Sequence, residues 1–286
     1  KVKGDKTFFH GKAAITGVLL TNLGTPAEAT PPAVRKFLKQ FLSDGRVIEI
    51  PKIIWWIILN AFILPKRPKE SAENYKKVWM EEGSPLMHYS EQQQKLLQKE
   101  MHVRFKGPVH IELAMRYGDP SIEAGLEALQ EKGARRILVL PFHCHKTGRL
   151  IAEKLGLKDG EWRLTFQSRF GKAEWVKPYT DKTLMALPGE GVKTVDVVCP
   201  GFPSDCVETL EEMNMENREY FMEAGGESYK LIPCLNDDPD HIQALADLIQ
   251  LHTQGWTETD SQWQAAEAEK QSAISKKQAL EKGAKL

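Results

Sequence analysis

The chain has 286 residues and carries 39 basic and 39 acidic side chains, so its formal net charge is zero. This length allows one large domain or two of about 100–150 residues each. Nothing in the charge balance points to a nucleic-acid partner. The four cysteines show no C-x-x-C pair and no regular spacing, which argues against a disulfide framework and favours reduced thiols in a cytoplasm.

Apolar runs alternate with amphipathic helical patterns along most of the chain. The predicted strands are 15–21, 109–115, 136–141, 163–168, 194–199 and 229–232. The predicted helices are 32–42, 71–80, 90–101, 122–132, 145–155, 180–187, 205–224 and 239–252. This alternation predicts an α/β fold with largely parallel sheets flanked by helices, in which ligands bind at the carboxyl ends of strands. Beyond residue 253 the sequence becomes polar and predicts a frayed helix or a disordered tail.

Residues 53–64 form an unusually apolar segment, and three cations follow it at Lys66, Arg67 and Lys69. The segment is shorter than the ~20 residues that a bilayer-spanning helix needs. Two interpretations stay open. The segment is either a buried helix or an exposed apolar lip that contacts a membrane surface or an apolar ligand. Its adjacent tryptophans favour the lip, because indole rings suit an interface between apolar and polar surroundings.

A row of acidic residues follows the strand at 194–199. A Pro/Gly turn leads from this strand into a helix that opens near Asp205. Glu208, Glu212 and Glu216 recur at i, i+4 and i+8, which places them on one face of an α-helix. Like charges at this spacing repel one another, which favours a cation that passes along them. The alternative is a solvated face whose acidic residues complement the helix dipole and form a capping box at Asp205.

Five motifs, taken in order, resemble one known family. They are GVLLTNLGTP at 17–26, GSPL at 83–86, MRYG at 115–118, TFQSRFG at 165–171 and CPGFPSDCVETLEE at 199–212. Over about residues 17–251 the chain resembles the ferrochelatases, and most of all the bacterial protoporphyrin type. The resemblance implies two similar α/β lobes around a porphyrin cleft and the insertion of Fe²⁺ into protoporphyrin IX in haem biosynthesis. It also implies Fe²⁺ as a substrate, no required cofactor and no iron–sulfur cluster.

The resemblance assigns roles to individual residues. Glu208 matches the catalytic carboxylate at the porphyrin face, and Glu208, Glu212 and Glu216 match a path for metal ions or protons. Cys206 stands where relatives often carry a histidine. The expected porphyrin-binding residues are Leu23, Arg67, Ser84, Arg116 and Phe202. Segment 53–64 would be the lip of the cleft, so the resemblance implies a cytoplasmic protein that contacts the membrane peripherally.

The chain departs from the family pattern after residue 142. In ferrochelatases the strand that matches 137–140 leads through a long crossover to another strand and a Ser-Phe-His-Gly motif with an active-site histidine. Here it runs directly into His143-Cys-His-Lys-Thr-Gly-Arg. We therefore expect an absent segment of roughly 60 or more residues. The expected divisions are a lobe at 1–142, an incomplete lobe at 143–253 with an exposed apolar face or an unpaired edge, and a polar tail at 254–286.

Two other histidines are candidates to replace the absent family histidine. His143 follows an apolar strand, as the family histidine does, whereas His10 precedes the first strand. His143, Cys144 and His145 also form a short cluster of metal-ligand types, without further ligands at regular spacing. Two functional interpretations stay open: a ferrochelatase-type enzyme, or a non-catalytic chain that is either a porphyrin-binding remnant or an unstable pseudoenzyme. The glycines match neither a P-loop nor a dinucleotide fingerprint.

Overall fold

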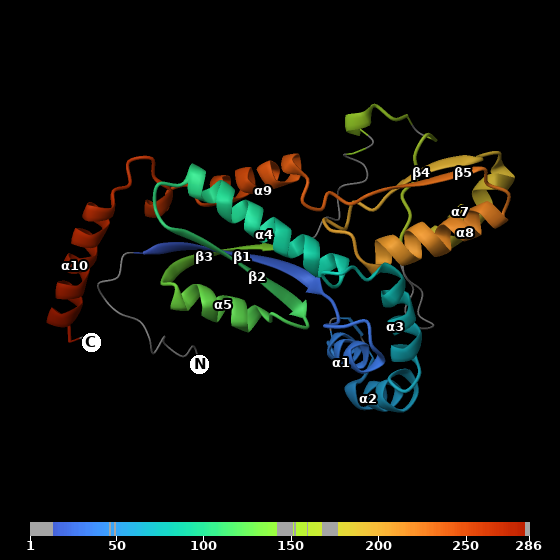
Figure 1. Cartoon of the computed structure of the whole chain (residues 1–286), viewed down its shortest axis with the longest axis horizontal. Coiled ribbons are helices and arrows are strands. Elements are labelled where there is room, and N and C mark those ends of the chain that lie inside the picture. Colours follow the sequence, from blue (N-terminus) through green and yellow to red (C-terminus); the bar gives the residue numbers. More distant parts are fainter. Residues whose placement is uncertain are drawn as a thin grey trace. The chain divides into compact units, whose positions relative to one another are not determined.

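The computed structural model describes residues 14–45, 47–48, 50–141, 151, 153–158, 160–167 and 177–283 (Figure 1). The chain divides into two compact units, each assembled from separate stretches of sequence. The first unit comprises Lys1–Thr25, Tyr89–Pro141 and Asp237–Leu286, and the second comprises Pro26–His88 and Phe142–Asn236. The lobes expected on either side of residue 142 stay a prediction.

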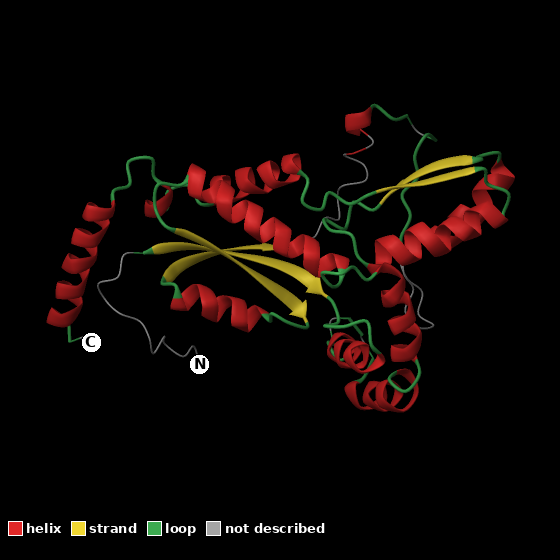
Figure 2. Ribbon diagram, in the orientation of Figure 1, coloured by secondary structure: helices red, strands yellow, loops and turns green. Residues whose placement is uncertain are grey.

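A parallel three-stranded sheet forms the centre of the first unit, in the order β2-β1-β3 (Figure 2). β1 spans Ile15–Gly24, β2 spans Val109–Tyr117 and β3 spans Ala134–Pro141. β1 is largely buried and has an apolar centre at Val18–Leu20, because the central strand of a parallel sheet is covered on both faces. Helix α5 (Ile122–Glu131) packs against all three strands. It approaches closely at Gly125, where an added Cβ would lie 2.8 Å from the Leu19 side chain.

Helix α4 (Pro85–Arg104) covers the open edge of β2 in the first unit. The side-chain amide of Gln98 donates to the Val109 carbonyl at 3.0 Å and accepts from the Ile111 N–H at 2.8 Å. Gln94 donates to the Ile111 carbonyl at 2.9 Å. These glutamines satisfy backbone groups that an edge strand otherwise leaves unpaired.

The residues after 253 are tied to the first unit at their start. After helix α9 (Pro239–His252) and the short turn η4 (Thr257–Thr259), the chain forms helix α10 (Ala265–Glu281). The Glu258 carboxylate is buried and accepts hydrogen bonds from Arg136 at 2.6 Å and Thr16 at 3.2 Å. Because these partners lie near the beginnings of β3 and β1, the first part of the segment predicted to be a frayed or disordered tail is docked on the sheet.

The second unit contains a two-stranded parallel sheet of β4 (Thr194–Val198) and β5 (Ser228–Ile232). Its longer helices are α1 (Pro31–Leu42), α2 (Lys52–Ile58), α3 (Arg67–Val78), α7 (Thr180–Ala186) and α8 (Asn217–Glu223). Three further helical segments are the π-helix η1 (Leu59–Ile63), the 3₁₀-helix η2 (Leu187–Glu190) and the π-helix η3 (Glu208–Glu216). η3 continues directly into α8.

The small sheet is covered on one face by a cluster of four buried side chains, Leu184, Leu187, Phe221 and Tyr229. Within the described residues, β4 and β5 pair only with each other. Val198 and Ile232 stay 43% and 42% exposed. This is unusual, because parallel sheets normally have both faces covered.

The α/β class with parallel sheets flanked by helices is confirmed. One predicted strand is wrong: residues 163–167 form only an isolated bridge between Phe166 and Tyr179. Its apolar residues lack a neighbouring strand, and a strand without a partner is not stable. The predicted helix at 145–155 falls largely outside the described residues.

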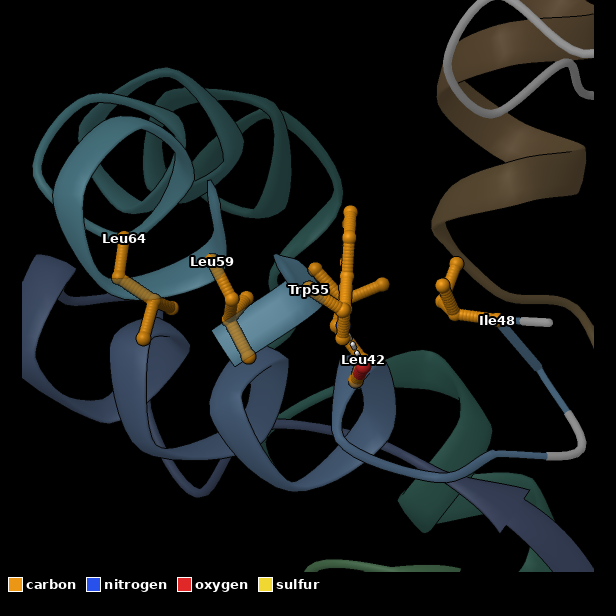
Figure 3. Close-up of a cluster of buried hydrophobic side chains, with 5 residues drawn as sticks. All are labelled: Leu42, Ile48, Trp55, Leu59 and Leu64. Carbon is orange, nitrogen blue, oxygen red and sulfur yellow. Dashed lines mark hydrogen bonds between the residues drawn. The ribbon is translucent and has the colours of Figure 1, made fainter. Parts of the chain in front are cut away.

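The apolar segment 53–64 forms α2 and η1 and buries one side against α1. Figure 3 shows the cluster that this side builds, which consists of Leu42, Ile48, Trp55, Leu59 and Leu64. The Trp55 indole N–H also donates to the Leu42 carbonyl at 2.6 Å. The buried-helix interpretation therefore holds for this side of the segment.

The opposite side of the same segment is open. Ile53, Trp56 and Phe62 are 80%, 65% and 67% exposed. We call these three side chains the exposed lip. No helix among the described residues has the length and apolar character needed to cross a membrane. The segment is thus amphipathic, with a core side and an exposed apolar side.

Candidate functional site

The loop after β4 is held in place by Asp205, whose side chain is buried. Its carboxylate accepts hydrogen bonds from the Thr209 hydroxyl at 2.9 Å and the Asn236 amide at 2.8 Å. The Asn236 side-chain oxygen in turn accepts from the Asp205 N–H at 2.8 Å. This reciprocal pair joins the loops that follow β4 and β5, and so fixes the start of η3. The predicted capping box between Asp205 and Glu208 is wrong, because the Asp205 carboxylate is bonded elsewhere.

The acidic helix is not the single α-helix predicted over 205–224. Its first nine residues form η3, a π-helix whose backbone bonds join residues five apart. Glu208, Glu212 and Glu216 are all half-buried along this helix. Wide π-turns within helices often occur at functional sites. Periodicity did not reveal this feature, because over nine residues the two helix types produce similar patterns.

Gln167 connects two members of the acidic row. Its side-chain amide donates to the Glu208 carbonyl at 2.7 Å and to the Glu212 carboxylate at 2.6 Å. The Glu212 carbonyl accepts a further bond from Asn217 at 2.8 Å. Gln167 belongs to the motif at 165–171, which suggested that it matters but gave it no role. In the structure it fixes the spacing of Glu208 and Glu212.

Two buried, protonated side chains lie beside Glu208. Burial, and then the negative charge of Glu208, raise the pKa of Tyr75 well above its ordinary range. The same two causes raise the pKa of the Cys206 thiol. Tyr75 comes from α3, far away in the sequence, and the sequence did not predict it. The thiol that stands in the histidine position is therefore uncharged and inaccessible to solvent.

Glu211 lies on the buried side of η3, between two predicted site residues. Its side chain is 1% exposed and pairs with the Lys77 ammonium of α3 at 2.7 Å. Burial, and then the charge of Glu211, raise the pKa of Glu216, whereas the charge of Lys77 lowers it. The sequence missed this ion pair, because its members are 134 positions apart and only folding shows the pairing.

Leu23 and Arg116 are brought together at the ends of adjacent strands in the first unit. The register of β1 and β2 pairs the residues on either side of them. Between these ends Gly24 has φ +109°, and an added Cβ would lie 1.8 Å from the Tyr117 carbonyl oxygen. Only glycine fits there. The Arg116 guanidinium lies 5.5 Å from the centre of the Tyr117 ring.

The remaining predicted porphyrin-binding residues belong to the second unit. Ser84 is buried, and its hydroxyl accepts a hydrogen bond from the Met87 N–H at 3.2 Å, as a helix cap does. Phe202 is half-buried in the turn after β4, where its N–H donates to the Cys199 carbonyl at 3.0 Å. Arg67 is exposed at the start of α3. The roles of these residues in binding stay predictions.

Metal binding by the acidic row also stays a prediction. Across the described stretches, no three His, Cys, Asp or Glu side chains converge as they would in a preformed metal site. A metal substrate that passes from one carboxylate to the next does not require such a cage. The histidines considered from the sequence, His10, His143 and His145, lie with Cys144 outside the described residues.

The parallel sheets flanked by helices define an α/β protein. The candidate site residues include acidic and aromatic side chains that follow strands, and α/β proteins bind ligands at the ends of strands. The chain matches the profile of the ferrochelatase family over residues 15–143 and 141–253. It therefore belongs to the ferrochelatase family, whose members are lyases that insert ferrous iron into a porphyrin in haem synthesis.

Individual relatives agree with this assignment. The chain is 43% identical to a ferrochelatase of Thioalkalivibrio sulfidiphilus over 364 aligned positions, which cover 99% of each chain. It is 40% identical to the ferrochelatase of Nitrosococcus oceani, with 95% of this chain and 98% of the relative covered. For the ferrochelatase of Marinobacter nauticus the identity is 40%, and the coverage is 88% and 90%.

The match to the family is interrupted near residue 142. The profile matches in two pieces that meet at residues 141–143. The 364 positions aligned with the first relative exceed the 286 residues of this chain, so at least 78 of those positions have no residue here. The two matched pieces meet at the junction where an absent segment is expected from the sequence, and that absent segment stays a prediction.

Proposed function

We propose that this chain binds protoporphyrin IX and inserts Fe²⁺ into it, with Glu208 as the carboxylate at the porphyrin face. The observation that carries this proposal is the construction of the acidic helix. It starts at the carboxyl end of a parallel strand, where α/β proteins bind ligands. Asp205 and Asn236 fix its first turn, and Gln167 holds Glu208 and Glu212 at a defined spacing.

The residues present suit the chemistry of metal insertion. Two pyrrole N–H protons must leave the ring while Fe²⁺ loses its water ligands and enters. A carboxylate near the ring centre accepts protons and provides an oxygen ligand for a hard cation. Glu208 would serve at the ring, while Glu212 and Glu216 would carry the metal ion or the protons along η3. The uncharged Tyr75 and Cys206 add no further charge beside Glu208.

The porphyrin would be recognised by apolar and polar side chains. Leu23 and Phe202 would contact the flat faces of the macrocycle, and Arg67, Ser84 and Arg116 would bind its propionates. Hydrogen bonds between arginine and a carboxylate are charge-assisted and strong. Fe²⁺ enters as a substrate, and the proposal requires no organic cofactor and no iron–sulfur cluster.

The test of this role is anaerobic insertion of Fe²⁺, followed by the loss of free-porphyrin fluorescence. Glu208→Ala should lower the rate by at least about a hundredfold, since loss of a proton acceptor typically has an effect of this size, while porphyrin binding persists. Glu223→Ala is a matched control, because Glu223 is an exposed carboxylate on the following helix α8. Equal insertion rates for Glu208→Ala and the unmodified chain would refute the assignment of Glu208.

A second candidate function is porphyrin binding without turnover. The break in the family match at residues 141–143 and the open face of the β4–β5 sheet favour this candidate, because both agree with an absent segment that carries the family histidine. The same fluorescence assay separates the two functions. Insertion above the protein-free rate supports the enzyme. Perturbed porphyrin fluorescence without insertion supports the binding remnant, and no effect of either kind contradicts both.

We also propose that the exposed lip contacts the membrane peripherally. Its three apolar side chains project from a short helical segment, and Lys52, Lys66 and Lys69 provide flanking cations. An amphipathic helix with basic flanks binds anionic lipid surfaces through apolar burial and charge attraction. Such contact suits a protein whose substrate is poorly soluble in water.

Co-sedimentation with vesicles of phosphatidylcholine and phosphatidylglycerol tests the lip. Trp56→Ser combined with Phe62→Ser should weaken binding by about tenfold or more, because two large apolar contacts are lost. Val103→Ser is the control, since Val103 is 79% exposed on α4 and outside the lip. Equal partition of the lip variant and the control would contradict membrane contact through this segment.

A further inference from the structure

The Lys77–Glu211 ion pair has an unusual construction. Glu211 is fully buried, yet only its Oε1 is paired, with the Lys77 ammonium at 2.7 Å. Its Oε2 is also buried and has no hydrogen-bond partner. A buried acceptor left without a partner destabilises the fold, because its hydrogen bonds to water are lost and not replaced. An apolar residue in the place of Glu211 would avoid this cost, so the buried pair calls for an explanation beyond stability.

Lys77 faces more than one carboxylate of η3. Glu211 and Glu216 are five positions apart, which is the spacing that backbone bonds join in a π-helix. The hydrogen bond to Glu211, together with the charges of Glu211 and Glu216, raises the pKa of Lys77. The ammonium thus pairs with Glu211 and lies within electrostatic range of Glu216. The Lys77 side chain is 48% exposed, so solvent reaches it.

We propose that Lys77 is an internal counter-ion of the acidic row, occupying the position that a divalent cation would otherwise take against Glu211 and so weakening the hold of the row on metal ions. This inference rests on the proposed function, in which the row passes Fe²⁺ toward the porphyrin. A path for a substrate ion must bind it firmly enough for entry and weakly enough for release. The row together with Glu211 comprises four carboxylates, which would retain the ion if no cation stood among them. Lys77 offsets one of their charges and satisfies only one oxygen of Glu211.

A titration with Mn²⁺ alone tests this inference. The purified chain is titrated, and free Mn²⁺ is measured by electron paramagnetic resonance. Lys77→Met should bind Mn²⁺ about tenfold or more tightly than the unmodified chain, because a unit charge near the ion is removed. Glu211→Gln added to Lys77→Met should reverse the gain. Lys77→Arg should leave the affinity unchanged, since it keeps the charge. The matched control is Lys76→Met, because Lys76 pairs with Glu73 on the exposed side of α3.

The outcomes separate this inference from the proposed function. One outcome is that the unmodified chain binds Mn²⁺, that Glu212→Gln lowers the affinity, and that Lys77→Met leaves it unchanged while its circular dichroism stays native. In that case the counter-ion role is wrong and the acidic path stands. If no variant binds Mn²⁺, the path is wrong and the counter-ion role falls with it. Should Lys77→Met fail to fold, Lys77→Gln retains a hydrogen-bond donor for Glu211 without the charge. An unchanged affinity in that variant overturns the inference equally.

Discussion

Replacement of Asp205 should be among the most damaging single changes in the second unit. Asp205→Ala removes the hydrogen bonds that its carboxylate accepts from the Asn236 amide and the Thr209 hydroxyl, and a longer contact of 3.4 Å from the Cys234 N–H. Hydrogen bonds to a charged group contribute about 1.5–3 kcal/mol each, so two good bonds predict a loss of about 3–6 kcal/mol. With an m-value of about 2 kcal/mol/M, the urea midpoint should fall by about 1.5–3 M.

The matched control for this change is Asp238→Ala. Asp238 is a neighbouring aspartate that caps α9 through a single bond from the Asp240 N–H at 2.9 Å. Loss of such a cap costs about 1 kcal/mol. Urea unfolding of both variants should be followed by far-ultraviolet circular dichroism. Equal midpoints for the two variants would refute the claim that Asp205 fixes the start of η3.

Three further predictions concern stability. Trp55→Ala should cost about 3–5 kcal/mol by opening a cavity beneath the lip, whereas Trp56→Ser should change stability by less than about 0.5 kcal/mol; comparison of their urea midpoints checks this. Gly24→Ala should cost at least about 3 kcal/mol, because its Cβ would collide with the Tyr117 carbonyl, and a melting temperature like that of the unmodified chain would contradict it. Burial raises the pKa of Cys199 to about 12, so its stabilisation is complete below about pH 9 and is lost as the pH rises toward 12. Cys199→Ser should therefore reduce the fall in urea midpoint between pH 7.5 and 10.

The fold was predictable from sequence wherever the local hydrophobic pattern by itself determines the type of element. The strand predicted at 109–115 is observed as Val109–Tyr117, and the helix predicted at 122–132 is observed as Ile122–Glu131. The prediction of a strand at 163–168 failed because pairing depends on a neighbouring strand, which local sequence does not encode. The docking of the segment beyond 253 was missed for a similar reason. Its anchors include the buried Glu258 carboxylate and the Trp256 ring beside Arg136, which stand within a polar stretch of sequence.

The candidate site was predictable only as far as its motifs extend. The motif at 199–212 pointed to the acidic helix and to Glu208. It gave no sign that Tyr75 and Lys77 lie against that helix, since α3 precedes it by more than 130 positions. Glu211 was overlooked because the i, i+4 pattern directs attention to one face of an α-helix. The observed π-helix and the ion pair with Lys77 make the buried face part of the site as well.

The supports of the acidic helix that the described residues provide come from stretches away from residue 142. Asp205 and Asn236 fix its start, Gln167 links the Glu212 carboxylate to the Glu208 backbone carbonyl, and α3 contributes Tyr75 and Lys77. All of these contacts lie within the second unit. A missing segment at the junction would therefore remove the family histidine without displacing Glu208. If insertion is absent while porphyrin still binds, the cause to examine is that loss, and a transplanted family segment should restore turnover only in chains that retain Glu208.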